Sequence, residues 1–464
     1  MELMQLTLAL AVLAALVIAE DCPRQPVTGA WYRLLLALAG MLLVGLFAFV
    51  SSRSIARGIR REVDRRGQWL RRFRRLRQIH VLLWLVVAGG ILYGLGWGQL
   101  VRFNWRLDHL FLVDRLMILV PVVLPLVVSW AAFYEVDRAL RLALIAGQAE
   151  AGQVASRGRY VLMQARHFLA LLLLPLLVVL AVQDAAERFF PGVLERTAGL
   201  AIYALPLLLL LTLFPLILRY VWQTRPLEPA ALRQRLEAAA RRVRFRCREI
   251  LVWNTGGMMI NAAVAGFLPP LRYVFLSDGL LSCLGDEEIA AVFAHEMGHV
   301  RHRHLPLRIA TIALPLSVWL LFTQTCPSIA ERLGLWCTTG GLGRQTAIGL
   351  ASLAAVGLYA GLVFGAVSRV LEYQADLFGC RVFEGNEKER SIGAMVSALE
   401  RLAYVSGLDR RWTGWQHASI ARRVEFLARA ASDPLFERRF DRRVRVLAGL
   451  ILAVNLSPLV AYLL

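Results

Sequence analysis

Long apolar runs separated by short polar segments dominate the pattern of this 464-residue chain. Most of the runs are long enough to cross a bilayer core of about 30 Å as a helix, whereas residues 3–19 and 168–183 are marginal. Several runs contain proline, which membrane helices tolerate better than helices in water. The pattern therefore predicts a polytopic α-helical membrane protein. The predicted spans are residues 3–19, 34–50, 81–101, 116–134, 168–183, 199–219, 309–325, 346–367 and 446–464.

The apolar runs also divide the chain into three predicted regions. Residues 1–219 are expected to form an N-terminal membrane domain of about six transmembrane helices. Residues 220–445 are expected to form a second, more polar domain that is interrupted by the spans at 309–325 and 346–367. Residues 446–464 are expected to form a C-terminal transmembrane helix.

The polar region after residue 219 carries shorter periodic elements. The stretch from Leu232 to Arg242 has the spacing of an amphipathic helix. The apolar stretches Ile250–Trp253 and Tyr273–Ser277 have the length and composition of strands, and a third strand is expected to begin in Asn261–Gly266. The predicted fold class is therefore mainly α, a helical membrane protein that carries a small α+β domain.

Composition and charge support the membrane interpretation. The chain is 58% hydrophobic with a mean hydropathy of +0.56, which is well above the range of soluble domains. Its formal net charge of +20 is distributed unevenly, because residues 51–80 carry 11 arginines whereas residues 102–115 carry three. This alternation predicts an N-terminus inside and a C-terminus outside. The segments expected on the cytoplasmic side are residues 51–80, 135–167, 220–308 and 371–445.

The basic residues do not indicate a nucleic-acid partner. Basic segments next to membrane spans are explained by anionic lipids, and no basic motif with interleaved aromatic residues accompanies them. The chain contains one lysine beside 52 arginines, a bias that is typical of a GC-rich genome and favours a bacterial one. The expected location is a bacterial inner membrane.

The clearest chemical signal is the segment HEMGH, in which two histidines lie four residues apart. On a helix His295 and His299 lie one turn apart on the same face, so both can reach one metal ion. Glu296 is placed to take a proton from a water on that metal. Acidic residues at 286–288 and apolar residues at helical spacing predict that the motif lies on a helix. The spacing is typical of a zinc-dependent hydrolase.

A catalytic zinc ion takes three protein ligands and keeps a fourth position for water, so a third ligand is required. Glu372 and Asp376 lie four residues apart on one face of a second predicted helix. Glu372 would bind the metal, and Asp376 would hold a ligand histidine or a neighbouring arginine. The alternative is a solvated acidic pair, although like charges at this spacing repel and favour a cation between them.

His302 is a rival third ligand because it lies close behind His299 in the sequence. It would have to come from the same helix, and three successive turns of one straight helix cannot surround a tetrahedral ion. His302 and His304 are therefore expected to lie at the interface or to support the ligands. The helix is expected to run to about His304 and to end at Pro306.

These segments resemble the M48 zinc metallopeptidases, a family that contains the CAAX prenyl proteases and the HtpX-type membrane proteases. HEMGHVRHRH is similar to the HExGHxxxxH of that family, and residues 372–376 are similar to its ExxAD element, in which the glutamate is the third zinc ligand. Residues 261–266 are similar to its NAxxxG segment, and residues 417–424 resemble HPSxxxRI, with Ala418 where proline is usual. The resemblance covers about residues 225–430 and implies a zincin-like peptidase domain.

The resemblance also implies a substrate-binding strand and two candidate catalytic residues. In the family, the segment that corresponds to Asn261, Ala262 and Ala263 leads an edge strand along the substrate cleft. His417 and Arg423 are hydrogen-bond donors suited to the oxyanion that forms when a peptide bond is hydrolysed. The alternatives are an ordinary turn asparagine, a surface histidine and a helix-end arginine.

The residues and the resemblance together predict a membrane-embedded zinc metalloendopeptidase. One Zn²⁺ ion per chain would be held by His295, His299 and Glu372, with Glu296 as the general base. The expected partners are protein or peptide substrates and the lipid bilayer. The resemblance implies either CAAX-type processing or quality control of misfolded membrane proteins, and the bacterial bias favours quality control. Two other classes remain, a sensor-transducer that cleaves a repressor and a catalytically silent scaffold.

Six cysteines are present, and none lies in a CxxC pair, so a cysteine zinc site is not expected. Cys326 and Cys337 share the short segment between the spans at 309–325 and 346–367, on the side that the charge pattern predicts to be oxidising. Their spacing allows a disulfide that closes a small loop, and the alternative is two free thiols.

Overall fold

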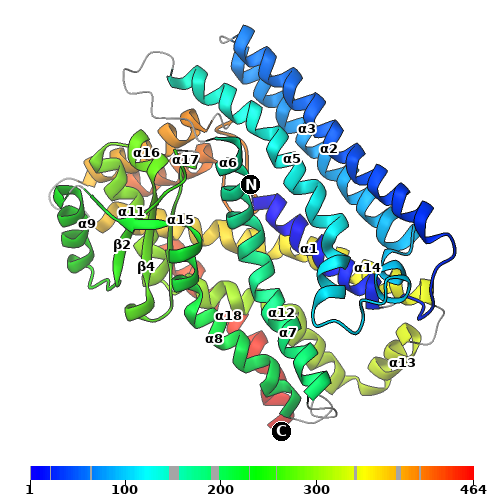
Figure 1. Cartoon of the computed structure of the whole chain (residues 1–464). Helices are drawn as coiled ribbons and strands as arrows, with labels where there is room; N and C mark the ends of the chain where they lie inside the picture. The colour runs from blue at the N-terminus through cyan, green and yellow to red at the C-terminus, as the bar shows by residue number, and fades with distance from the viewer. Residues whose placement is uncertain are drawn as a thin grey trace. The chain divides into compact units, whose positions relative to one another are not determined.

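The computed structural model describes residues 2–20, 22–62, 65–145, 156–189, 198–228, 230–257, 259–338, 342–382, 388–406 and 409–463. In these residues the chain is mainly helical and carries one small sheet (Figure 1). It separates into two compact units. The N-terminal unit contains Met4–Gln223, and the C-terminal unit contains Thr224–Asn254 and Met259–Leu464.

All elements that the structure describes in the N-terminal unit are helices. Helices α2, α3 and α5 pack side by side (Figure 1), with the indoles of Trp84 and Trp130 buried between helices. The Trp84 indole N–H donates to the carbonyl of Val122 at 2.9 Å. The elements are α1 (Glu2–Glu20), α2 (Ala30–Arg61), α3 (Arg66–Gly89), η2 (Gly90–Gly94), α4 (Trp97–Gln99), η3 (Leu100–Asn104), α5 (Val113–Ile145), α6 (Arg157–Gln164), η4 (Ala165–Ala170), α7 (Leu171–Phe189) and α8 (Ala198–Val221).

Eight helices in the described part of the chain are long and apolar enough to cross a membrane, which confirms a multi-pass membrane protein. They correspond to eight of the predicted runs. The remaining run, residues 3–19, lies in α1, whose described apolar part Thr7–Glu20 is shorter than the others. The run predicted at 81–101 is displaced, because the span covers Gln68–Gly94 and Gly96 then adopts φ +64, which only glycine adopts readily.

The C-terminal unit carries a four-stranded sheet in the order β1-β2-β4-β3. β2 (Glu249–Trp253) and β4 (Tyr273–Ser277) are parallel, and β3 (Ala262–Ala265) pairs antiparallel with β4. All three predicted strands are present. The sequence analysis missed β1 (Thr224–Pro226), which pairs antiparallel with β2, because it is only three residues long and contains a proline.

Helices surround this sheet and form the core of the C-terminal unit. Leu236 of α9 and Phe293 of α11 pack with Val252, Val274 and Leu276 of the central strands. The predicted helix from Leu232 to Arg242 is thus confirmed within α9. The remaining elements are α9 (Ala230–Arg242), η5 (Pro269–Leu271), α10 (Asp278–Cys283), α11 (Asp286–Arg301), α12 (His304–Thr325), α13 (Pro327–Thr338), α14 (Leu342–Tyr359), η6 (Ala360–Phe364), α15 (Gly365–Val382), α16 (Lys388–Val405), α17 (Ile420–Ser432) and α18 (Pro434–Leu463).

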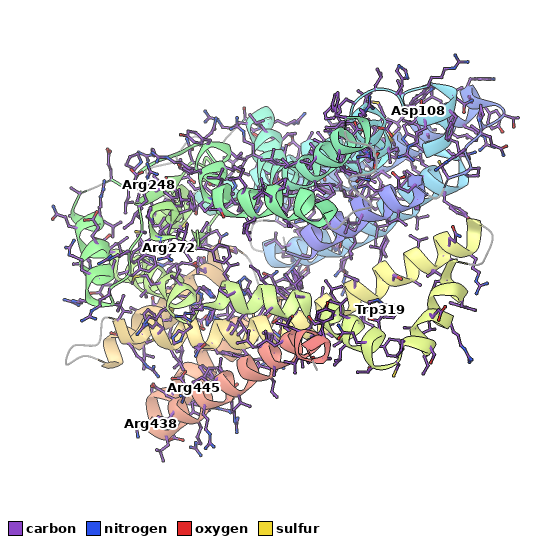
Figure 2. All side chains as sticks on the ribbon, turned by 90° about the horizontal axis from the view of Figure 1, so that it is seen from below. Asp108, Arg248, Arg272, Trp319, Arg438 and Arg445 are labelled. Atoms are coloured by element: carbon purple, nitrogen blue, oxygen red, sulfur yellow. The ribbon has the colours of Figure 1, made fainter. Side chains whose placement is uncertain are left out.

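The apolar helices α12 and α18 of this unit pack against each other through a polar contact. The Ser317 hydroxyl donates to Asn455 Oδ1 at 2.9 Å, and the Asn455 amide donates to the carbonyl of Ala310 at 3.1 Å. Figure 2 shows Arg438 and Arg445 extending from the N-terminal half of α18.

The helix that carries the histidine motif ends earlier than predicted. α11 ends at Arg301, Arg303 takes the left-handed φ of 54°, and α12 begins at His304. Pro306 does not end a helix but lies in the first turn of α12, where backbone N–H groups lack helical partners and proline is tolerated. The two helices therefore meet at a sharp bend.

Cys326 and Cys337 are free thiols. The helix α13 occupies the segment between them. A helix rises about 1.5 Å per residue, so eleven residues separate the two Cα atoms by about 16 Å, whereas a disulfide needs less than about 7 Å. Of the two alternatives that the sequence left open, the structure therefore has the free thiols, because the intervening segment is a helix and not a closed loop.

Candidate metal centre

The predicted ligands come from α11 and α15, which cross at small residues. A Cβ added to Gly298 of α11 would lie 3.1 Å from the Cα of Ala375, and a Cβ on Gly379 of α15 would lie 3.1 Å from the backbone nitrogen of His295. Glycine inside a helix destabilises it by roughly 0.5–1 kcal/mol relative to alanine. Here it allows the two backbones to approach closely, which brings the histidines of α11 to the carboxylates of α15.

The start of α11 is stabilised by the acidic residues that precede the motif. Glu288 Oε2 accepts a hydrogen bond from the backbone N–H of Gly285 at 2.9 Å, and its other oxygen accepts from the Ser397 hydroxyl. Asp286 and Glu287 also lie in the first turn, where negative charge offsets the helix dipole. The histidines therefore lie on a well-anchored helix, as the sequence predicts.

Three residues from the two helices, which we call the donor triangle, bring two ring nitrogens and both oxygens of one carboxylate to the spacing that a zinc ion requires. His295 Nε2 lies 3.2 Å from His299 Nε2. Glu372 Oε2 lies 3.6 Å from His295 Nε2, and Glu372 Oε1 lies 3.5 Å from His299 Nε2. Zinc bonds of about 2.0–2.2 Å at tetrahedral angles separate ligand atoms by roughly 3.3–3.6 Å. These donors therefore fit a single tetrahedral metal ion.

Glu296 lies beside this triangle. The ligand-type atoms of His295, Glu296 and His299 all lie within 4.8 Å of one another. Burial raises the pKa of the Glu296 carboxyl, and the charge of His295 opposes that rise. A carboxylate in such surroundings is a stronger proton acceptor than one in water, which suits the predicted general base.

The surroundings of His295 favour a positive charge at this position. Burial acts to lower the pKa of the imidazole, but its hydrogen bonds with Asp376 and Glu372 raise the pKa to about 9. The buried carboxylates therefore stabilise a cation next to the ring. A metal ion would supply that charge and leave the imidazole neutral, as metal binding requires.

Asp376 contacts both a ligand histidine and an arginine, the two partners that its position in the sequence allows as alternatives. Its Oδ1 lies 2.8 Å from His295 Nδ1, and the Arg423 guanidinium donates to both carboxylate oxygens at 2.7 and 2.5 Å. The Asp376 side chain is completely buried. Arg423 comes from α17, whose first turn is capped by the Ser419 hydroxyl. This pairing fixes the imidazole with Nε2 directed at the triangle.

His299 is supported by a second chain of polar residues. Its Nδ1 lies 2.8 Å from His304 Nδ1, and His304 Nε2 lies 3.0 Å from Gln374 Oε1. The Gln374 amide donates to Asp441 at 3.2 Å. The bend at Arg303 makes this contact possible, because it turns the first residue of α12 back toward α11.

His302 lies against aromatic rings rather than at the donor triangle. Its ring stacks on His304 with centroids 5.7 Å apart and meets Phe378 edge-on at 5.6 Å. Between the two rivals for the third position, Glu372 is the residue whose oxygens lie next to both motif histidines. His304 supports His299, a role that the sequence analysis left open as one of two.

The side chains of His417 and Arg308 also contact the Glu372 carboxylate. His417 Nδ1 lies 2.8 Å from Oε2, and the Arg308 guanidinium donates to Oε1 at 2.9 Å. The sequence analysis missed Arg308, although an arginine in the first turns of an apolar helix is a signal for a buried partner. Gly365 lets the segment before His417 approach α15 closely, because a side chain at position 365 would collide with the carbonyl oxygen of Trp415.

The predicted substrate-binding residues lie at the free edge of the sheet. Asn261 is exposed, and its backbone N–H donates to the Ser277 hydroxyl at 2.9 Å at the start of β3. Ala262 and Ala263 lie in β3, which pairs only with β4 among the described strands. Gly266 ends the strand with φ +116, and a Cβ there would clash with the backbone of Arg272. The outer edge of β3 therefore presents unpaired backbone groups near α11.

Comparisons with known proteins agree with this geometry. The model of a protein family described as "Peptidase family M48" matches residues 226–440. A "Protease HtpX homolog" of Aeropyrum pernix is 30% identical over 43% of this chain, and one of Desulfatibacillum aliphaticivorans is 31% identical over 32%. A "CAAX prenyl protease 1 homolog" of Arabidopsis thaliana is 26% identical over 38%. The chain spans 63%, 45% and 42% of the length of these three relatives.

Among solved structures, "Crystal Structure of S. mikatae Ste24p" is similar over 87% of this chain and 100% of that chain, with a TM-score of 0.49 and 16% identity. The chain is thus a multi-pass membrane protein whose candidate site lies within the matched segment. Residues 226–440, a little under half of the chain, are therefore similar to peptidase family M48. The matched region contains every site residue that the sequence analysis named.

Proposed function

We propose that this chain is a zinc-dependent metalloendopeptidase that hydrolyses peptide bonds of membrane-associated or misfolded proteins. The observation that carries the proposal is the donor triangle of His295, His299 and Glu372, in which each imidazole Nε2 lies 3.2 Å from the other and 3.5 or 3.6 Å from one of the two Glu372 oxygens, a spacing that suits a tetrahedral zinc ion. Glu296 lies beside the triangle on the same helix. A hydrolase of this kind needs both features, a metal with an open position and an adjacent base.

In this mechanism each residue around the triangle has a separate task. A zinc ion held there would polarise the peptide carbonyl and acidify the attacking water. Glu296 accepts a proton from that water and later donates it to the leaving amine. His417, whose side chain is 47% exposed, is placed to donate to the oxyanion. Arg423 acts through Asp376 to orient His295, because its guanidinium is committed to that carboxylate.

The substrate is proposed to bind as an extended segment along β3. The edge strand offers unpaired backbone donors and acceptors, so recognition would depend on the peptide backbone and be only loosely selective for sequence. Asn261 at the start of the strand would hold the peptide through its exposed amide. Such recognition suits removal of misfolded membrane proteins, as the likeness to HtpX homologues also favours, and CAAX-type processing is the alternative.

The catalytic domain is proposed to face the cytoplasm of a bacterial cell. The support is the arginine alternation, since residues 51–80 and the basic parts of the C-terminal unit would share one side of the membrane. Reporter fusions after Arg33, Arg66, Arg106 and Arg241 are expected to report outside, inside, outside and inside. An outside location for the fusion after Arg66 would reverse the orientation of the whole chain.

The proposed activity is tested by removing the metal from the purified full-length protein. Incubation with 1,10-phenanthroline is expected to lower cleavage of casein by at least about 100-fold, because both the carbonyl and the water lose their activating ion. Addition of zinc should restore cleavage, and the non-chelating 1,7-phenanthroline serves as the control. Undiminished cleavage by protein whose zinc content has fallen to zero would contradict a zinc-dependent mechanism.

A further inference from the structure

A pocket lined by arginines lies in the N-terminal unit where α2 and α5 pack together. Its lining consists of Arg53, Ala56, Arg57 and Arg60 of α2 and Glu135 of α5. Its volume of about 390 Å³ is within the range of small-ligand sites, about 300–1,000 Å³. We refer to it as the arginine pocket.

The arginines of this pocket are not equally engaged. Arg60 donates to Glu135 at 3.1 Å, and Arg157 contacts the other oxygen of the same carboxylate. Arg53 and Arg57 have no carboxylate partner among the described residues, and the Arg53 guanidinium lies 4.3 Å from the centre of the Phe49 ring. The pocket thus combines one neutralised arginine with two whose positive charge is unpaired.

The exposed apolar face of α2 leads directly to these unpaired arginines. Leu42, Leu46 and Val50 are 70%, 53% and 59% exposed, and Arg53 and Arg57 continue the same face at helical spacing. The helix rises about 1.5 Å per residue, so the apolar part of this face extends roughly 12 Å before the first arginine. A ligand that matches the whole face must carry an anionic group and an adjoining hydrocarbon chain.

We propose that the arginine pocket binds the phosphate headgroup of an anionic phospholipid, whose acyl chain lies along the exposed face of α2. Phosphate suits a guanidinium group, because it accepts two parallel hydrogen bonds from one fork. Basic pockets between membrane helices are suited to anionic headgroups. Ala56 lines the pocket and is buried, and its small side chain leaves room for the headgroup between the two helices.

The proposal is tested by titrating the purified full-length protein with phospholipids and counting bound lipids by native mass spectrometry. The wild-type protein should bind phosphatidylglycerol more tightly than phosphatidylcholine. R53Q/R57Q should bind phosphatidylglycerol about 25-fold more weakly, at roughly fivefold for each arginine near the headgroup. R53K/R57K keeps the charge but loses the guanidinium fork, so its affinity should lie between those of the wild type and R53Q/R57Q.

The matched control is R71Q/R75Q, which removes two exposed arginines of α3 and changes the net charge equally. This variant should bind phosphatidylglycerol as the wild type does. Equal losses in the two glutamine variants would overturn the proposal in favour of general attraction between charges. Equal binding of the two lipids would also overturn it, as would inorganic phosphate that displaces phosphatidylglycerol at the same concentration and so identifies a site for soluble anions.

Discussion

Glu372→Ala is expected to lose both metal and peptidase activity. Glu372 supplies one of three donors, and its side chain is 1% exposed, so water can replace the missing carboxylate only poorly. The substitution also leaves Arg308 and His417 without the acceptor that they share. Changes next to a metal ligand lower affinity by about 10–100-fold, and removal of a ligand itself should exceed that range. Zinc content per purified chain, measured beside casein cleavage, gives the result.

Two other variants test whether Glu372, and not Asp376 or His302, is the third metal ligand. Asp376→Asn keeps a hydrogen-bond acceptor for His295 but removes the negative charge, so it should weaken zinc binding by about 10–100-fold. His302→Ala should retain one zinc per chain, because its ring packs on Phe378 and His304. Zinc retained in Glu372→Ala but lost in His302→Ala would transfer the third-ligand role and refute the proposed centre.

Glu296→Gln is expected to keep the metal and to lose most of the catalytic rate. The amide has nearly the size of the carboxylate and still forms hydrogen bonds, but it cannot accept a proton from the attacking water. General-base catalysis contributes about 10²–10⁴-fold, so the turnover number should fall by that factor. The measurement is casein cleavage under saturating substrate with zinc content determined on the same samples.

Glu287→Gln is the control for this second expectation. Glu287 lies in the first turn of the same helix, and its side chain is 45% exposed near Arg235, away from the donor triangle. Its variant should cleave at the wild-type rate. If Glu296→Gln loses zinc together with activity, Glu296 is a ligand and not the base. An inactive Glu296→Gln protein that holds zinc should also retain bound substrates, which crosslinking in native membranes would identify.

The strands and the motif helix were predictable because their signals are local. The apolar stretches of β2 and β4 and the helical spacing around His295 each depend on neighbours in the sequence. The pairing of the motif with Glu372 could be predicted because zinc chemistry demands a third donor, and the family resemblance named one. These inferences required no knowledge of how distant helices pack.

The remaining contacts depend on packing that no local pattern encodes. His304 reaches His299 only because Arg303 adopts a left-handed conformation, which arginine seldom does and which its sequence context does not indicate. Arg308 reaches Glu372 through the approach of α12 to α15. The helix α13, which lies between Cys326 and Cys337, was also not predicted from the sequence.

The glycines at the crossing of α11 and α15 limit how this protein can be engineered. Replacing helical glycine with alanine is a common route to higher thermal stability, because alanine restricts the unfolded chain. At Gly298 and Gly379 the new methyl group would lie 3.1 Å from the backbone of the opposite helix. Widening the crossing by even a few tenths of an ångström would enlarge the donor triangle. A screen that ranks variants by melting temperature alone would not detect this enlargement, so zinc content has to be measured beside it for variants at these two positions.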